Sequence, residues 1–334
     1  TLARSGLVVL YLALAVSFAI VTPPFEAPDE TGHLFYINHV AVTGRLPVQT
    51  DPSRAVVGEG HQFPLYYVVA AIPVRAFLAD NSVDLLPVKN RRYEAPDAAG
   101  RHFPKFLHRD VEMFAAGSDQ TMFYLLRGYS IALGALTVLL TYAIAGMIRS
   151  EIWFQLLAAA LVATLPQFLF ISASINNDNL VTLASTATIY AALRFWRRPT
   201  MRGAIVMGLT LGIALLTKKS ALVLIPAVGV IVAALWVRCE PDRPAVARSG
   251  LIAIGIAALL GAPVFIRNQI VYGDPLGTAM ERETLPELVD EKSLWSPYWL
   301  ETFLPRLAES FVGVFGWMNV WLPPAVYLVY FALS

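Results

Sequence analysis

Long apolar runs alternate with two polar stretches along the chain, and this alternation is the main structural signal in the sequence. A membrane-crossing helix needs roughly 20 mostly apolar residues, and most of the runs approach that length. The pattern predicts an all-α integral membrane protein with about eight transmembrane helices. The predicted helices cover 6–22, 122–148, 152–173, 179–195, 203–217, 220–237, 250–266 and 311–333, and the pair 203–217 and 220–237 is also compatible with a hairpin that does not fully cross.

These runs divide the chain into five segments. They are a first transmembrane helix (1–22), a large outer loop (23–121), a transmembrane bundle (122–266), a second outer loop (267–310) and a last transmembrane helix (311–334). The first run has no small-residue cleavage site, so we interpret it as a retained span and not as a signal peptide. Because the last run ends while it is still apolar, we expect the chain to be incomplete.

The first outer loop contains segments that are apolar but poorly suited to crossing a membrane. Residues 64–79 are short, contain Pro73 and Arg75 and lie between polar segments, so they predict an interfacial or re-entrant helix. A further surface helix is expected to begin at Pro28 or Asp29 and to end near Gly44. Its apolar face would consist of Leu34, Ile37, Val40 and Ala41.

The composition supports a membrane protein and excludes other classes. Hydrophobic residues make up 57% of the chain, charged residues only 15%, and the mean hydropathy is +0.59. An average soluble domain carries about 25% charged residues. The composition therefore excludes an ordinary soluble enzyme or a disordered chain, and the net charge of +1 excludes a nucleic-acid binder. The single cysteine, Cys239, excludes an intrachain disulfide.

The distribution of charge predicts the orientation in the membrane. The two outer loops together carry 20 acidic and 13 basic side chains, whereas the short connections on the opposite side are rich in arginine. By the positive-inside rule that opposite side is cytoplasmic, so both large loops face outward from the cytoplasmic membrane. The basic residues that define this side are Arg4, Arg149, Arg197, Arg198, Arg202, Arg238, Arg243 and Arg248.

Two carboxylates follow the first span directly, at the level of the lipid headgroups. Asp29 and Glu30 either stabilise the start of the following helix or provide a general base at the membrane surface, and the residues alone leave both hypotheses open. All five histidines lie in the same loop: His33, His39, His61, His102 and His108. Their spacing matches no zinc motif, and histidines also collect in polar loops because they avoid apolar spans.

Charged or amide residues interrupt the outer ends of the bundle at three places. Ionisable residues in apolar segments are costly and indicate function. The three places are Asn176–Asn179, which includes Asn177 and Asp178, then Lys218 with Lys219, and Arg267 with Asn268. Lysines on the outer side oppose the inside bias, so an anionic ligand such as a phosphate or pyrophosphate is one explanation. Snorkelling of the lysines to lipid phosphates is the other.

Short motifs distributed in order from 23 to 323 resemble the GT-C superfamily of integral membrane glycosyltransferases. They are PDETGH (28–33), HQFPLYY (61–67), LLRGYSIALGALTVLLTY (125–142) and GIALLTKKSALVLIP (212–226). RNQIVYGDPLG (267–277) and FVGVFGWMNVWLP (311–323) resemble a bacterial subgroup related to protein mannosyltransferases and lipid A aminoarabinose transferases. Phe63 departs from the best-known relatives, in which a second proline is frequent at that place.

The resemblance implies an inverting transfer of a sugar at the outer membrane face. The donor would be a polyprenyl-phosphate sugar and the acceptor a hydroxyl on a lipid, a glycan or a protein. The family's base corresponds to Asp29, with Glu30 as its neighbour in the catalytic pair. Stabilisation of the donor phosphate would fall to Lys218, Lys219 and Arg267, with His61, His33, Asn177 and Asp178 as further substrate-binding residues. No metal site is assigned, and a divalent cation near Asp29 and Glu30 is left open as a cofactor.

Two alternative functions remain. One is a non-catalytic membrane subunit that keeps the fold within a larger complex. The abrupt end of the chain favours this alternative, whereas the charged pairs Asp29–Glu30 and Lys218–Lys219 argue against it. The other is a lipid or solute transporter. A transporter predicts ionisable groups near the middle of the membrane and repeated halves, and the sequence has neither feature.

Overall fold

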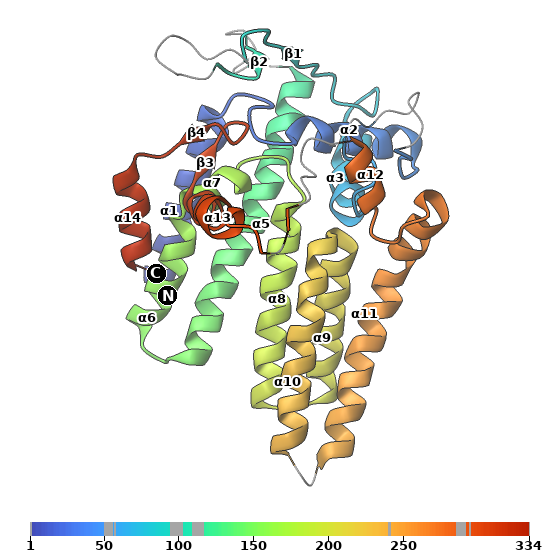
Figure 1. Ribbon diagram of the computed structural model, residues 1–334, viewed down its shortest axis with the longest axis vertical. Coiled ribbons are helices and arrows are strands. Elements are labelled where there is room, and N and C mark those ends of the chain that lie inside the picture. The colour runs from blue at the N-terminus through green and yellow to red at the C-terminus, as the bar shows by residue number, and fades with distance from the viewer. Residues whose placement is uncertain are drawn as a thin grey trace.

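The computed structural model is almost entirely helical, so the all-α class is confirmed. It describes residues 2–49, 56, 58–93, 103–108, 117–239, 242–284, 292–293 and 295–333. Long helices run side by side below a cap of shorter helices and loops (Figure 1). The strands of the described residues form two short antiparallel pairs, β1 (Val88–Lys89) with β2 (Phe106–Leu107) and β3 (Val314–Phe315) with β4 (Val320–Trp321).

The long helices form two packed groups. α1 (Leu2–Val21), α6 (Ile152–Ala163) and α7 (Pro166–Ser172) pack on α5 (Ser118–Ile148) around buried residues such as Tyr11. The second group has its core around Phe195 and Met207 and contains α8 (Asp178–Arg197), α9 (Met201–Thr217), the 3₁₀ helix η2 (Lys219–Val223), α10 (Leu224–Arg238) and α11 (Arg243–Tyr272). α5 also contacts α8 and so joins the two groups.

The structure does not confirm the predicted count of eight spans. Of the described helices, 4 are long and apolar enough to cross a membrane, or up to 5 if α6 and α7 are one bent span. These two helices meet at 61°, because Pro166 cannot continue the hydrogen-bond ladder of α6 and starts a new helix. α9 has only 17 residues, and α8 carries polar residues along its length.

The segment 311–333 does not form the single helix that its apolar sequence predicted. α13 (Leu304–Val312) ends at Gly313, the β3–β4 hairpin follows, and α14 (Pro324–Leu333) is only 10 residues long. Pro323 and Pro324 lack backbone N–H donors, which favours a helix start at this point. The remaining helical turns of this region are α12 (Thr278–Thr284) and the π-helical segment η5 (Trp299–Phe303).

The cap is organised by two short helices of the segment between α1 and α5. α2 (Glu30–Thr43) ends at Gly44, whose φ of 66° is the left-handed conformation that glycine adopts without strain. α3 (Leu65–Phe77) has 13 residues, too few to cross a membrane, and it packs on α2. The rings of Tyr36 and Tyr67 stack between these helices with centroids 3.8 Å apart. Leu34, Ile37 and Ala41 of α2 are buried, as expected for its apolar face.

Close packing of α9 against α11 depends on Gly208, which gives the first testable prediction. A Cβ atom at Gly208 would lie 2.6 Å from the carbonyl oxygen of Ala253, so any larger side chain must separate the two helices. Gly208→Leu should lower stability by about 1–3 kcal/mol, which thermal unfolding in detergent would measure. Gly255→Leu is the matched control, because Gly255 has open space around its Cβ position. Equal losses in both variants would contradict the prediction.

Candidate functional site

Asp29 lies at the turn between α1 and α2, with its side chain free of a capping role. An aspartate at this position normally accepts a hydrogen bond from the first turn of the helix. Asp29 instead adopts a left-handed backbone, with φ of 61°, and its side chain makes no cap hydrogen bond. The capping hypothesis therefore fails for this side chain. The carboxylate remains exposed at the surface of the cap.

The surroundings of Asp29 shift its acidity in opposing directions. Protein atoms close in on it from one side, and this partial loss of hydration raises the pKa of the Asp29 carboxyl above its ordinary value. Lys218 and Lys105 lower that pKa, whereas Asp178 raises it. Since Asp29 is also solvent-accessible, screening weakens each of these effects. The structure thus brings three of the predicted residues, Asp29, Asp178 and Lys218, into one electrostatic group.

Lys218, the C-cap of α9, and Asp178, the first residue of α8, form an ion pair. The Lys218 Nζ and Asp178 Oδ1 atoms are 2.6 Å apart, and the side chains are 25% and 44% exposed. An exposed pair of this kind contributes little to stability. Because both groups stay accessible, the lysine can exchange its carboxylate partner for an incoming anion.

Glu30 lies in a different environment from Asp29, although the two are adjacent in sequence. Both Glu30 and Arg127 are 0% exposed, and they form a two-pronged ion pair with N–O distances of 2.9 and 2.8 Å. The Glu30 carboxylate also accepts backbone N–H groups of Phe25 and Ile175. Arg127 donates to the carbonyl oxygens at the end of α1, those of Ala19, Thr22 and Pro23. The pair joins α1, α2, α5 and the loop before α8.

His33 is also enclosed by the cap. Its Nδ1 lies 2.8 Å from the Tyr67 hydroxyl, and the residue is fully surrounded by protein. Burial, together with the nearby Lys218, lowers the pKa of His33 to about 3, although Asp178 acts in the opposite direction. The imidazole is therefore neutral at physiological pH. A neutral ring in this position orients Tyr67 and does not supply charge to a ligand.

The other predicted residues have separate contacts. Arg267 donates to the carbonyl oxygen of Pro47 and, over 3.3 Å, to Asn268 Oδ1. Asn177 is buried with its amide nitrogen 3.5 Å from Gln62 Oε1, beside the buried His61. Lys219 begins η2 and is half-buried. These contacts hold Arg267 to the outer loop, whereas Lys218 faces Asp178.

Two residues that the sequence analysis did not select belong to the site. Lys105 influences the Asp29 carboxyl and stacks its ammonium 2.9 Å from the centre of the Trp317 ring. Glu26 holds this segment in place, since its carboxylate accepts the backbone N–H groups of Lys105 and Phe106 and contacts His108. Nothing in the sequence distinguishes Lys105 from other loop lysines. Arg127, by contrast, is an ionisable residue in an apolar stretch, which is a recognisable signal.

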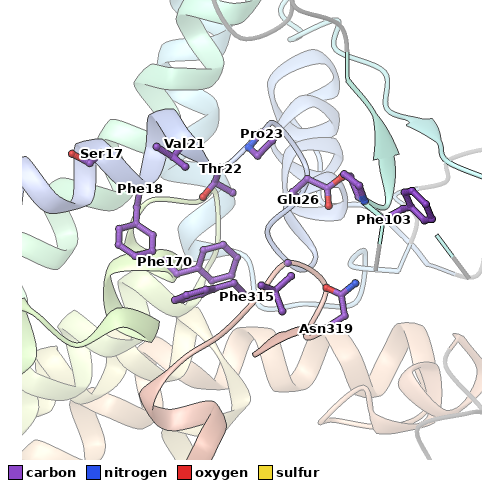
Figure 2. Close-up of a pocket in the computed structure, with 13 residues that line it drawn as sticks. Ser17, Phe18, Val21, Thr22, Pro23, Glu26, Phe103, Phe170, Phe315 and Asn319 are labelled. Carbon is purple, nitrogen blue, oxygen red and sulfur yellow. The ribbon is translucent and has the colours of Figure 1, made fainter. Parts of the chain in front are cut away.

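An apolar cavity of about 530 Å³ opens beside this loop (Figure 2). Its wall includes Phe18 and Val21 of α1, Phe170 of α7 and Phe315 of β3, while Glu26 lies at its rim. Neither Asp29 nor Lys218 lines it. Glu26 connects the two regions, because it lines the cavity and accepts the backbone N–H of Lys105.

The carboxylates do not gather into an obvious metal site. Among the described residues, no three His, Cys, Asp or Glu side chains lie close enough to hold a metal ion together. Glu30, one of the two residues for which a divalent cation was left open, has both oxygens occupied by N–H donors. In the described residues, positive charge near Asp29 comes from lysine side chains.

Comparison with known proteins agrees with this architecture. Residues 109–272 match the model of the dolichyl-phosphate-mannose-protein mannosyltransferase family. The fold is similar to a chain of the S. cerevisiae protein O-mannosyltransferase Pmt1-Pmt2 complex bound to the sugar donor, with a TM-score of 0.53 and 17% identity. That match covers 82% of this chain and 34% of the yeast chain.

No protein of curated function matches the sequence. The family match and the fold are nevertheless concordant, because α5, α6, α7, α8, α9, α10 and α11 all fall within or overlap the matched region. The recognition made from the short motifs is confirmed at this level: residues 109–272, just under half of the chain, match the dolichyl-phosphate-mannose-protein mannosyltransferase family, and the fold is similar to that of the yeast protein O-mannosyltransferase chain.

Proposed function

We propose that the chain transfers a sugar from a polyprenyl-phosphate donor to a hydroxyl acceptor at the outer face of the cytoplasmic membrane. The observation that carries this proposal is Asp29, an exposed carboxylate with a raised pKa beside the Lys218–Asp178 pair. A base must be accessible and poised near its working pH, and a phosphate leaving group needs fixed positive charge. The raised pKa and the exposure of Asp29 support the first requirement, and the nearby Lys218 supports the second.

The reaction needs one displacement. Asp29 accepts the proton of the acceptor hydroxyl as its oxygen forms a bond to the anomeric carbon. The bond from that carbon to the phosphate oxygen breaks at the same time, so the configuration is inverted and the polyprenyl phosphate leaves as an anion. No second carboxylic acid is required, because a phosphate is already a good leaving group, unlike the sugar alcohol released by a glycosidase.

The roles of the other residues follow from their contacts. Lys218 leaves its ion pair with Asp178 and binds the donor phosphate instead. Lys105, in the segment that Glu26 holds in place, adds positive charge near Asp29. The apolar cavity beside the 23–29 loop takes the first part of the lipid chain. We assign Glu30 a positioning role, since its carboxylate is buried against Arg127, and we assign His33 the same role through Tyr67.

A transfer assay tests the proposal directly. The purified full chain in lipid nanodiscs would be supplied with radiolabelled polyprenyl-phosphate mannose, or with a panel of other polyprenyl-phosphate sugars, and with membrane lipid and peptide acceptors. We expect label to move to one acceptor class and free polyprenyl phosphate to appear in equal amount. Donor binding without transfer to any acceptor in the panel would instead support the non-catalytic subunit.

The pH dependence of transfer provides a second prediction at the same site. Asp29 must be ionised to act, so kcat/KM should fall on the acid side around a pKa above that of an ordinary aspartate. Lys218→Met removes a charge that lowers this pKa, and the acid limb should move to higher pH. Asp178→Asn removes a charge that raises it, and the limb should move to lower pH. Shifts of the same sign in both variants would contradict the assignment of the limb to Asp29.

A further inference from the structure

A second cavity lies at the end of the bundle away from Asp29, where α8 ends and α9 begins. Its volume is about 620 Å³, and its wall includes four arginines: Arg194, Arg197, Arg198 and Arg202. The first three belong to the last turn of α8 and its C-cap, and Arg202 lies in the first turn of α9. All four side chains are exposed, so their charges are accessible to a ligand.

This cluster goes beyond what membrane orientation alone explains. The positive-inside rule requires basic residues in short loops but does not require them to share one cavity. Arg194 lies over the ring of Tyr190, which also lines the cavity. Arg149, Arg238 and Arg243 instead lie over rings outside the cavity, those of Phe154, Trp196 and Trp236.

The arginines of the cavity are also left without counter-charges. No acidic side chain lines it, and the four arginines make no ion pair within the described ranges of the chain. Water and salt screen the repulsion among these exposed guanidinium groups, and a bound anion would offset what remains.

The rest of the wall indicates the kind of anion. Thr200 and Gly203 lie among the arginines, and the Thr200 side chain caps α9 by accepting the Gly203 N–H. Met147, Ala191 and Val206 contribute apolar surface from α5, α8 and α9. A phosphate held by guanidinium groups therefore has apolar surface beside it, as the phosphate of a phospholipid does. A free phosphate would leave that apolar surface unused.

We propose that this arginine cavity binds the phosphate headgroup of an anionic phospholipid, with the acyl chains along α5, α8 and α9. The site is separate from the one assigned to sugar transfer and does not depend on that function. Each guanidinium near an anionic lipid should change affinity by about fivefold. Two arginines removed together should therefore weaken binding by about 25-fold.

Native mass spectrometry of the purified full chain in a neutral detergent measures this binding. The probes are dioctanoyl-phosphatidylglycerol, dioctanoyl-phosphatidylcholine and inorganic phosphate. We expect phosphatidylglycerol to bind at least tenfold more tightly than phosphatidylcholine, and Arg194→Gln with Arg197→Gln to lose about 25-fold in that affinity. Arg248→Gln is the matched control, an exposed arginine on α11 outside the cavity, and it should stay within twofold of wild type.

Three results would overturn the proposal. The first is equal affinity for phosphatidylglycerol and phosphatidylcholine. The second is an equal loss of phosphatidylglycerol affinity in the double variant and in Arg248→Gln. The third is displacement of the lipid by inorganic phosphate at equal concentration, which would indicate a free-anion site. If the double variant does not purify as a folded protein, Arg198→Gln alone applies the same test. That exposed residue should lose about fivefold.

Discussion

Replacing Asp29 with asparagine is expected to lower the rate of sugar transfer by about 10²–10⁴-fold, the usual contribution of a general base. The amide has nearly the shape of the carboxylate but cannot accept the acceptor's proton. Asparagine also tolerates the left-handed backbone that residue 29 adopts, so the turn before α2 should persist. Initial rates at saturating donor, measured in nanodiscs, would quantify the loss in kcat.

Controls for this variant separate chemistry from folding. Asp80→Asn changes another exposed carboxylate of the outer loop and should leave the rate within about twofold, because Asp80 lies at a turn outside the charged group. The thermal unfolding temperature of Asp29→Asn should not fall, since ionisation of a carboxyl whose folded-state pKa is raised disfavours folding at neutral pH. Undiminished transfer in a folded Asp29→Asn protein would remove Asp29 from the mechanism.

Replacing Arg127 with methionine is expected to lower the free energy of unfolding by about 3–5 kcal/mol. Glu30 would remain buried without its counter-charge, and the carbonyl oxygens of Ala19, Thr22 and Pro23 would lose their common donor. Chemical unfolding in mixed micelles, followed by tryptophan fluorescence, measures the difference. Transfer should fall as well, because the loop that carries Asp29 is held by this pair.

A double variant distinguishes the ion pair from simple packing. Glu30→Gln with Arg127→Met removes both charges, so it should recover part of the stability lost by Arg127→Met alone. Arg75→Met is the matched arginine control. Arg75 is exposed and donates one hydrogen bond to the Ala41 carbonyl, so its loss should cost about 1 kcal/mol or less. A double variant less stable than Arg127→Met would contradict the pair as the cause.

Hydropathy predicted most helices of the bundle but not which of them are long enough to cross. The runs at 122–148 and 250–266 correspond to α5 and α11, which extend further as regular helices. The prediction of one helix over 311–333 was wrong, because hydropathy measures apolar character and does not detect residues that end or start a helix. Gly313 and the prolines at 323 and 324 divide that run into a hairpin and two short helices, and these residues were visible in the sequence.

Site residues that stand out in their local sequence could be predicted. Site residues that come together only through contacts between distant segments could not. The sequence placed Asp29 and Lys218 at the ends of apolar segments, and the family resemblance assigned them to one site. The structure brings them close enough for Lys218 to lower the pKa of the Asp29 carboxyl. The difference between Asp29 and Glu30 could not be foreseen, because it depends on Arg127 and on the backbone of Ile175 reaching Glu30 from distant segments. Lys105 likewise reaches the site through Glu26 and Trp317.

The buried ion pair between Glu30 and Arg127 also determines when the cap can fold during synthesis of the chain. The two residues are 97 positions apart, so at ribosomal speeds of roughly 5–20 residues per second Glu30 emerges about 5–20 s before its partner. During that interval the carboxylate must remain in water or in the headgroup layer. The cap therefore cannot lock onto α1 until α5 has been inserted, and Asp29 reaches its final position only after that step.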